Sequence, residues 1–554
     1  MRPQLRFHTA LALLLIASRA FAQAGDAHIV LRIGDLLPTG ETVLNIFDPQ
    51  IVDDGRWSAA VIVSGTPIIG AARDGLVVDG QLVLAEGDFL LTGEQIESVS
   101  EHDLGPNGGL VAVLTVRAPG AVTNEQVVWR NGAVLVREGP ISGAGVPIGA
   151  ELYQIFDFDL NGPYGAMNAT LKVGGVSRTC TLAYDFTTGS ATPTITLIGL
   201  QGQVLAPFTD PYDFAYTGRG LHTDSAGAVA FYGAVTASSG LQRCAWVDGL
   251  NVFLEGGPSP APNSLWEGTY GAQLVHAEGG NYAVAARIER LSNGSISSVI
   301  YRNGQAVAVV GAPLNGVLGL QVRPYDATSI SMADSGELFF VVPLGSLTTT
   351  SYTALMADSE MLIRTGQSAA SGLTITSFIP QQGSTIDASP DGNYCIFRAY
   401  VSSGPEALCV LERSVGQPTA CVSAPNSTGV RGRLLGSGFS YVAANDLVVT
   451  AVDLPPNAFG YLNTSRTAGF VAQPGGSVGN LCLGGSIGRY VANVQSSGAV
   501  GVIATTIDLN SMPQPLGSQP VVAGQGWAFQ LWHRDAGPSG AVSNWSDPLL
   551  VRFR

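Results

Sequence analysis

Short apolar runs recur along most of the chain, and turns that contain glycine separate them. The stretch 127–139, "VVWRNGAVLVREG", is one example: two apolar runs flank Asn131-Gly132, and the second run ends before Gly139. Apolar runs bounded by Gly, Asn and Asp are typical of β-strands, and Asn-Gly between two runs predicts a two-residue hairpin turn, because both of its residues need positive φ. The pattern favours an all-β chain.

A second phrase, a turn with glycine followed by an apolar run, recurs seven times, and 223–235, "TDSAGAVAFYGAV", is a clear copy. Its glycines are spaced 52 to 62 residues apart, at Gly55, Gly108, Gly165, Gly227, Gly279, Gly336 and Gly392. The hairpin phrase follows in register in most periods. Four short antiparallel strands in each period correspond to one blade of a propeller, so the repeat predicts a seven-bladed β-propeller.

The two ends of the repeated region complement each other. Residues 29–40, "IVLRIGDLLPTG", match the outer-strand phrase at 82–93, yet no other strands of a blade precede them. The last repeat has no full outer strand before Pro425. We therefore expect the N-terminal strand to complete the seventh blade, which would close the ring without open sheet edges.

The inner phrase at 224–231, "DSAGAVAF", resembles the N-x-x-G-x-x-A-F tandem repeats of exported bacterial choice-of-anchor proteins. The resemblance covers residues 27 to about 420, although Ala-Phe is intact only at 230–231. It implies a propeller-like repeat protein of bacterial origin and no catalytic residues. The segment from 421 onward is similar to a module at the C-termini of large exported bacterial proteins.

These patterns predict three parts of the chain. Residues 1–22 have the features of a signal peptide, with arginines, an apolar run and an A-x-A cleavage motif. Residues 23–420 form the expected propeller. Residues 421–554, where the repeat stops and strand patterns alternate with Gly/Pro turns, form an expected β-sandwich for attachment or secretion. We expect an exported protein located outside the cell, at the cell surface or in the periplasm.

Composition narrows the partners. The net charge is −15, and every basic residue except Lys172 is an arginine that stands apart from the others. Without a basic patch, nucleic acid and anionic membranes are not expected as partners. No stretch after the signal peptide approaches the length of a transmembrane segment. The expected partner is an unidentified protein or glycan.

Six cysteines in an exported chain are free to form disulfides. Cys395 and Cys409 lie symmetrically about Ser402, so a hairpin would place them opposite each other, and the alternative is two separate buried thiols. Cys421 and Cys482 form the other expected pair. The remaining two, Cys180 and Cys244, occupy one position in successive repeats and are expected to be too far apart to bond.

The sequence offers only weak candidates for functional residues. Acids gather at the inner turns, at Asp53, Asp54, Asp159, Asp224, Glu278, Asp334 and Asp391. Such acids either cap turns or bind calcium, and capping is the interpretation that we favour. With nearby histidines, the metal candidates are Asp224, Glu278, His222 and His276, alongside His102; no other cofactor is expected.

Three further motifs favour structural roles. Ser477 and Ser486 satisfy G-x-S-x-G, but neither is followed by the helix that a nucleophile elbow requires, although His533 and Asp535 lie downstream. Tryptophans at strand positions of the repeat are interpreted as blade packing rather than as sugar-stacking platforms. They are Trp57, Trp129 and Trp246.

The sequence favours a non-enzymatic binding or structural protein whose propeller presents loops to a partner. The alternative is an extracellular polysaccharide lyase or hydrolase with its site in the propeller channel, and no catalytic residue is assigned for it. Propellers serve both classes, so the fold does not decide between them. A channel lined with carboxylates or histidines would favour the enzyme.

Overall fold

The computed structural model describes residues 27–64, 72–105, 109–187, 193–215, 220–238, 240–267, 273–314, 320–325, 329–346, 350–367, 374–379, 385–402, 404–413, 415–419, 421–537 and 540–553. In these ranges the chain is built from strands and three single 3-10 turns, η1 (Glu278–Gly280), η2 (Pro474–Gly476) and η3 (Val491–Asn493). The all-β prediction is confirmed. The expected signal peptide, residues 1–22, lies outside these ranges.

The described chain divides into two compact units, one spanning Ala27–Leu411 and the other beginning at Glu412. The sequence placed this boundary after residue 420. Within the described ranges, no helix is long and apolar enough to cross a membrane.

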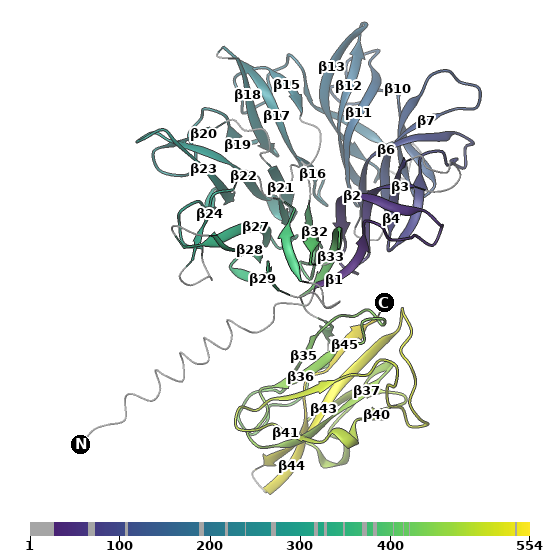
Figure 1. Cartoon of the computed structure of the whole chain (residues 1–554), viewed down its shortest axis with the longest axis vertical. Helices are drawn as coiled ribbons and strands as arrows, with labels where there is room; N and C mark the ends of the chain where they lie inside the picture. Colours follow the sequence, from purple (N-terminus) through teal and green to yellow (C-terminus); the bar gives the residue numbers. More distant parts are fainter. Residues whose placement is uncertain are drawn as a thin grey trace. The chain divides into compact units, whose positions relative to one another are not determined.

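The first unit contains seven antiparallel sheets of four or five strands (Figure 1). We number the sheets in chain order, from the one that begins with β2 to the one that contains β1. The first three contain β2 (Thr42–Ile51), β3 (Trp57–Ser64), β4 (Ala72–Val78) and β5 (Gln81–Ala85); β6 (Gln95–Leu104), β7 (Leu110–Arg117), β8 (Glu125–Arg130) and β9 (Ala133–Arg137); β10 (Gly139–Pro140), β11 (Glu151–Asn161), β12 (Tyr164–Val173), β13 (Val176–Asp185) and β14 (Thr194–Leu200).

The next three sheets share one plan, in which two short strands both pair with the strand that follows them. They contain β15 (Tyr212–Ala215), β16 (Leu221–Thr223), β17 (Val229–Ala237), β18 (Gly240–Val247) and β19 (Leu250–Leu254); β20 (Ser264–Glu267), β21 (Gln273–Ala277), β22 (Asn281–Arg290), β23 (Ser295–Arg302) and β24 (Gln305–Val309); β25 (Gln321–Val322), β26 (Ile330–Met332), β27 (Leu338–Gly345), β28 (Thr350–Ala357) and β29 (Glu360–Arg364).

The seventh sheet joins the two ends of the unit. It contains β30 (Ile375–Phe378), β31 (Ile386–Ala388), β32 (Tyr394–Val401), β33 (Glu406–Glu412) and β1 (Ala27–Arg32). Strand β1 pairs antiparallel with β33, so that Ala27 faces Leu411 and Arg32 faces Ala407. Ala27 and Leu31 are almost fully buried. This is the pairing that the half-repeat at the N-terminus predicts.

The hairpin turns have the backbone that the sequence predicts. Asn131 and Gly132 have φ values of 46° and 98°. The Asn131 side chain also accepts a hydrogen bond from the backbone N–H of Leu110, at 3.0 Å. Asp79 accepts from Trp57 in the same way, at 2.9 Å. The Asn or Asp therefore has two roles: it tolerates positive φ, and it ties the turn to the start of a neighbouring strand.

The second unit has a seven-stranded sheet, a three-stranded sheet and a two-stranded hairpin. Their strands are β34 (Gln417–Pro418), β37 (Phe459–Ser465), β40 (Gly488–Arg489), β41 (Gln495–Ser496), β43 (Gly526–Gly537), β44 (Gly540–Trp545) and β45 (Leu549–Arg552); β35 (Arg433–Ser437), β36 (Val448–Val452) and β42 (Ile503–Thr506); β38 (Thr467–Val471) and β39 (Leu481–Gly484). The two larger sheets share one hydrophobic core, with Val449 from one and Trp527 from the other.

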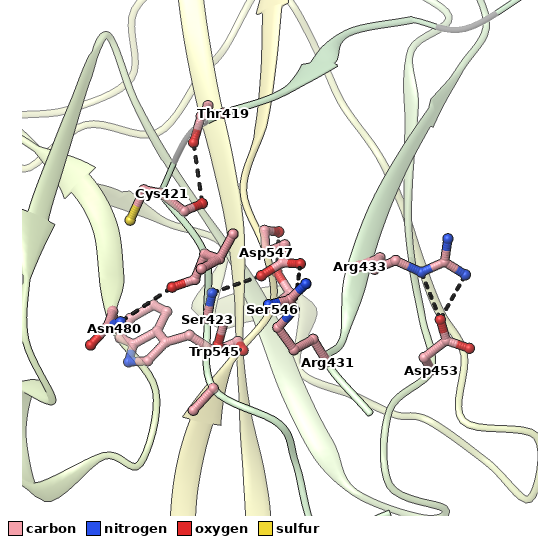
Figure 2. A network of polar contacts seen from close by, with 12 residues as sticks. Thr419, Cys421, Ser423, Arg431, Arg433, Asp453, Asn480, Trp545, Ser546 and Asp547 are labelled. Carbon is pink, nitrogen blue, oxygen red and sulfur yellow. Dashed lines mark hydrogen bonds and ion pairs between the residues drawn. The ribbon is translucent and has the colours of Figure 1, made fainter. Parts of the chain in front are cut away.

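A disulfide and a polar network hold the first segment of the second unit in place. Cys421 bonds Cys482, with their Cα atoms 5.9 Å apart, so this expected pair is confirmed. Figure 2 shows the neighbouring contacts: Ser423 donates its backbone N–H to Asp547 at 2.7 Å, and Asn480 donates to the carbonyl oxygen of Val422 at 3.2 Å. The disulfide and these hydrogen bonds join segments that lie far apart in the sequence.

The predicted disulfide between Cys395 and Cys409 is wrong. Neither cysteine forms a disulfide, and both are completely buried in the hydrophobic core that surrounds the seventh sheet. Burial raises the pKa of Cys409 to about 12, so little thiolate is available for disulfide exchange. The alternative of separate buried thiols holds, and Cys180 and Cys244 are also buried and form no disulfide.

Candidate active site

A cavity of about 220 Å³ lies among the inner strands β2, β6, β11, β16, β21 and β31, and we call it the inner cavity. Six of its lining residues are acids and three are histidines: Asp48, Glu101, Asp103, Asp157, Asp159 and Asp387, with His102, His222 and His276. None of the described residues that line it is Arg or Lys. The inner cavity therefore concentrates groups that can carry protons.

The acids of the first three sheets come from two positions of the repeat. Asp48, Glu101 and Asp157 stand two residues before Gln50, Asp103 and Asp159. In the second and third sheets, side chains two apart in a strand lie on one face, so both members of each pair face the inner cavity. In the first sheet the register of β2 shifts between Phe47 and Gln50, and Asp48 and Gln50 also line the inner cavity. We call Asp48, Glu101 and Asp157 the paired acids.

The second position of each pair connects one sheet to the next. Asp103 accepts a hydrogen bond from the backbone N–H of Leu160 at 3.2 Å. Asp159 accepts from Thr223 at 2.6 Å in the same way. Gln50 accepts from Leu104 at 2.5 Å and donates to the carbonyl oxygen of His102 at 2.9 Å. These bonds join the first four sheets through their inner strands.

The remaining sheets continue these connections. His222 bonds the carbonyl oxygen of Leu274 at 3.0 Å through Nε2, and Gln273 accepts from the N–H of Ile330 at 3.0 Å. Ser331 accepts from the N–H of Ala388, and Asp387 accepts from the N–H of Ile51, each at 3.0 Å. The last bond returns to the first sheet. We call the seven donors and acceptors the ring residues: Gln50, Asp103, Asp159, His222, Gln273, Ser331 and Asp387.

Two ring residues, Asp103 and Asp159, have strongly raised pKa values. Burial raises the pKa of Asp103 to about 6, and the negative charge of Asp387 adds to the effect, while the N–H of Leu160 opposes it. Burial also raises the pKa of Asp159 well above its usual range, and the neighbouring charge of Asp103 contributes. Neighbouring carboxyls whose pKa values are raised in this way can keep a proton near neutral pH, as a general acid must.

The four metal candidates from the sequence do not converge. Asp224 accepts hydrogen bonds from the N–H groups of Ala226 and Ala228 within its own turn. Glu278 accepts from the N–H and the hydroxyl of Ser225, at 2.7 Å each. His222 and His276 both line the inner cavity, and His222 uses Nε2 as a ring residue. Within the described ranges, no group of three His, Cys, Asp or Glu residues is placed to hold a metal ion. Calcium binding stays the untested alternative to turn capping.

The acids at the inner turns act mainly on backbone groups and on one another. Asp53 accepts from the N–H of Asp391 at 2.6 Å. Burial raises the pKa of Asp334 to about 6, and the charges of Glu278, Asp53 and Asp391 contribute. The turn-capping interpretation describes these contacts.

The remaining candidates have structural positions. The hydroxyl of Ser477 donates to the carbonyl oxygen of Ser543 at 2.9 Å, and His533 is fully buried with Nδ1 on the carbonyl oxygen of Arg534. Trp57 and Trp246 are buried, and Trp246 stacks on Phe231 with ring centroids 5.4 Å apart. These contacts agree with loop and blade-packing roles.

The sequence interpretation named Asp159, the three histidines of the inner cavity and Asp103 as the acidic neighbour of His102, but it missed the other acids, Asp48, Glu101, Asp157 and Asp387. A signal was present: an acid five or six residues before the repeat glycine, with another acid two residues earlier, in successive repeats. It was overlooked because attention went to the acids beside the glycine.

No protein-family model and no curated protein matches the chain. Solved structures that resemble it include an α-L-arabinanase of Penicillium chrysogenum, at 12% identity over 59% of this chain and 96% of that one, with a TM-score of 0.28. The β-propeller domain of the Trilobed protease of Pyrococcus furiosus matches at 9% identity over 66% and 92%, with a TM-score of 0.34. An α-L-arabinofuranosidase of Fusarium graminearum matches at 10% identity over 55% and 90%, with a TM-score of 0.24.

The expectation of a non-enzymatic binding or structural protein is corrected at this point. Two of these three structures are glycosidases. What favours the polysaccharide-degrading alternative in this chain is the lining of the inner cavity, with six acids and three histidines. Likeness at this level identifies neither a family nor a substrate. The side chains of the inner cavity must therefore support the case for catalysis.

Proposed function

We propose that the first unit is a seven-bladed β-propeller that hydrolyses glycosidic bonds of a polysaccharide in the inner cavity. The observation that carries the proposal is the pair of neighbouring carboxyls, Asp103 and Asp159, with raised pKa values beside the paired acids Glu101 and Asp157. We further propose that the second unit is a β-sandwich and that the protein is exported, as the Cys421–Cys482 disulfide and the expected signal peptide suggest.

Glycoside hydrolysis needs two carboxyl groups in different protonation states. The protonated member of the Asp103 and Asp159 pair gives its proton to the leaving oxygen as the bond from that oxygen to the anomeric carbon breaks. An ionised acid, Glu101 or Asp157, takes a proton from the water that attacks the anomeric carbon. Water is the only co-reactant, and the proton count balances over one turnover.

Hydrolysis fits the inner cavity better than the lyase version of the alternative. A polysaccharide lyase acts on a uronic acid, whose carboxylate must be neutralised before a base removes the neighbouring proton. The described lining offers six acids and no Arg or Lys for that task. Like charges would repel a uronate instead.

The test is a screen of the purified full-length chain against neutral, acidic and amino polysaccharides, measured as release of reducing ends. We expect hydrolysis of at least one, and a fall of about 10²- to 10⁴-fold in kcat for Asp103→Asn and for Glu101→Gln. Glu360→Gln, at an exposed position where β29 begins, is the matched control and keeps full activity. A chain that releases no reducing ends from any polysaccharide, or variants that stay fully active, would contradict the proposal.

A further inference from the structure

The inner cavity has a strongly one-sided charge. Its acids come from β2, β6, β11 and β31, and the described lining includes no Arg or Lys. Arg130 acts on Asp103 and lowers its pKa slightly, but it does not line the inner cavity. Carboxylates held this close raise one another's pKa, which means that each would gain from a positive charge placed between them.

A histidine on a different strand supplies a second, uncharged contact. His276 of β21 lines the same cavity and is only 9% exposed. Neither of its ring nitrogens has a hydrogen-bond partner among the described residues. Burial lowers the pKa of His276, although Asp224, Glu278 and Asp248 oppose the shift. The neutral ring offers one donor and one acceptor, and a buried polar group of this kind is normally satisfied by a partner.

Together, the two features describe a ligand with both a positive charge and hydroxyl groups. An ammonium group is attracted to the acids and can donate to them, and a sugar hydroxyl can both donate to and accept from a neutral imidazole. A simple metal cation would interact with the acids alone, and a neutral sugar would gain only the contact with the histidine.

We infer that the inner cavity selects polysaccharides with free amino groups, of the glucosamine type, with the ammonium at the paired acids Glu101 and Asp157 and a hydroxyl at His276. The inference rests on the proposed function for its catalytic meaning, because it names the substrate class of the same site. Binding and cleavage can nevertheless be measured separately.

The test compares three tetrasaccharides by titration calorimetry with the full chain in slightly acidic buffer: the glucosamine tetramer, its N-acetylated form and the galacturonate tetramer. We expect the glucosamine tetramer to bind about 10-fold more tightly than the acetylated form, the equivalent of one well-placed charge. High salt should reduce the preference because it screens charge. Glu101→Gln should reduce it as well, whereas Glu360→Gln should not. His276→Ala should weaken both glucosamine-based tetramers by a similar factor.

Equal binding of the acetylated or the galacturonate tetramer would overturn the inference. If such a chain still cleaves a neutral polysaccharide, the proposed function stands and only the substrate class is wrong. Conversely, a clear preference for the glucosamine tetramer without cleavage of any polysaccharide would overturn the proposed function and support the inference. Spermine or calcium that binds as tightly as the tetramer, or a His276→Ala variant with unchanged affinities, would overturn the sugar part.

Discussion

The first three sheets and the later sheets of the repeated unit use one strand position for different purposes. In the first three, the residue two before the ring residue is one of the paired acids of the inner cavity. In the fourth, sixth and seventh sheets the same position is Gly220, Ser329 and Thr385. The ring residue itself is polar in both groups of sheets.

The packing explains why the later sheets differ. A Cβ atom at Gly220 would lie 2.6 Å from the Cβ of Tyr232, so no side chain fits there. The hydroxyls of Ser329 and Thr385 form a hydrogen bond of 2.6 Å, and this bond joins the sixth sheet to the seventh. The difference teaches that the ring position connects the sheets in every repeat, and that in the second and third sheets it also carries the carboxyls with raised pKa values, Asp103 and Asp159. The position two residues before it carries an acid only in the first three sheets.

The largest effect should follow from opening the ring altogether. Removal of residues 23–36 takes away β1, and with it the partner of β33 and the buried side chains of Ala27 and Leu31. We expect the first unit to lose its cooperative unfolding transition, because the seventh sheet is left with an unpaired edge and an open core. Thermal unfolding followed by circular dichroism measures this. A truncated chain that melts at the parental temperature would show that β1 does not close the unit.

A smaller effect should follow from removing one ring residue. Asp387→Ala leaves the N–H of Ile51 and the hydroxyl of Ser331 without their acceptor. The expected loss is about 1–3 kcal/mol in the free energy of unfolding, the cost of unpaired buried polar groups. Denaturant titration measures it, and Asp387→Asn, which keeps an acceptor oxygen, should recover most of the loss. Equal losses in both variants would count against the ring.

A still smaller effect is expected at the position that distinguishes the two groups of sheets. Thr385→Ala removes the hydroxyl that bonds Ser329, for an expected cost of about 1 kcal/mol and unchanged kcat. Glu101→Gln, at the corresponding position of the second sheet, should show the reverse: little change in unfolding free energy and a large fall in kcat. If Thr385→Ala reduces kcat as strongly as Glu101→Gln, the division between the sheets is wrong.

The smallest effect concerns pH. The folded pKa of Asp103, about 6, lies above its ordinary value of 3.8, so the folded state binds more protons than the unfolded state between these values. Stability should therefore rise as the pH falls from 7 to 5, and the gain should be smaller in Asp103→Asn, where Asp159 and Asp334 still have raised pKa values. Differential scanning calorimetry at both pH values measures the melting temperatures. A wild-type chain and a variant that shift in parallel would refute the assignment to Asp103.

Local chemistry made much of the fold predictable. Asn131 and Gly132 tolerate the positive φ that a two-residue hairpin turn requires, and such a turn between apolar runs allows few pairings. The N-terminal half-repeat also predicted its partner strand, because a strand with an unpaired edge is unfavourable. The Cys421–Cys482 disulfide was also predicted. The state of Cys395 and Cys409 was not, because it depends on the burial of both side chains in a hydrophobic core, which their symmetric spacing about Ser402 does not reveal.

The sequence by itself determined the strands, their turns and the repeat, since these depend on residues that are close together along the chain. Only the tertiary structure decided what the acids do. Asp48, Asp103, Asp159 and Asp387 stand roughly 50 to 340 residues apart in the sequence. The inter-sheet bonds bring them to one cavity, where burial and neighbouring negative charge raise the pKa values of Asp103 and Asp159. A carboxylate's pKa depends on what surrounds it in space, and that surrounding is set by contacts that no local pattern encodes.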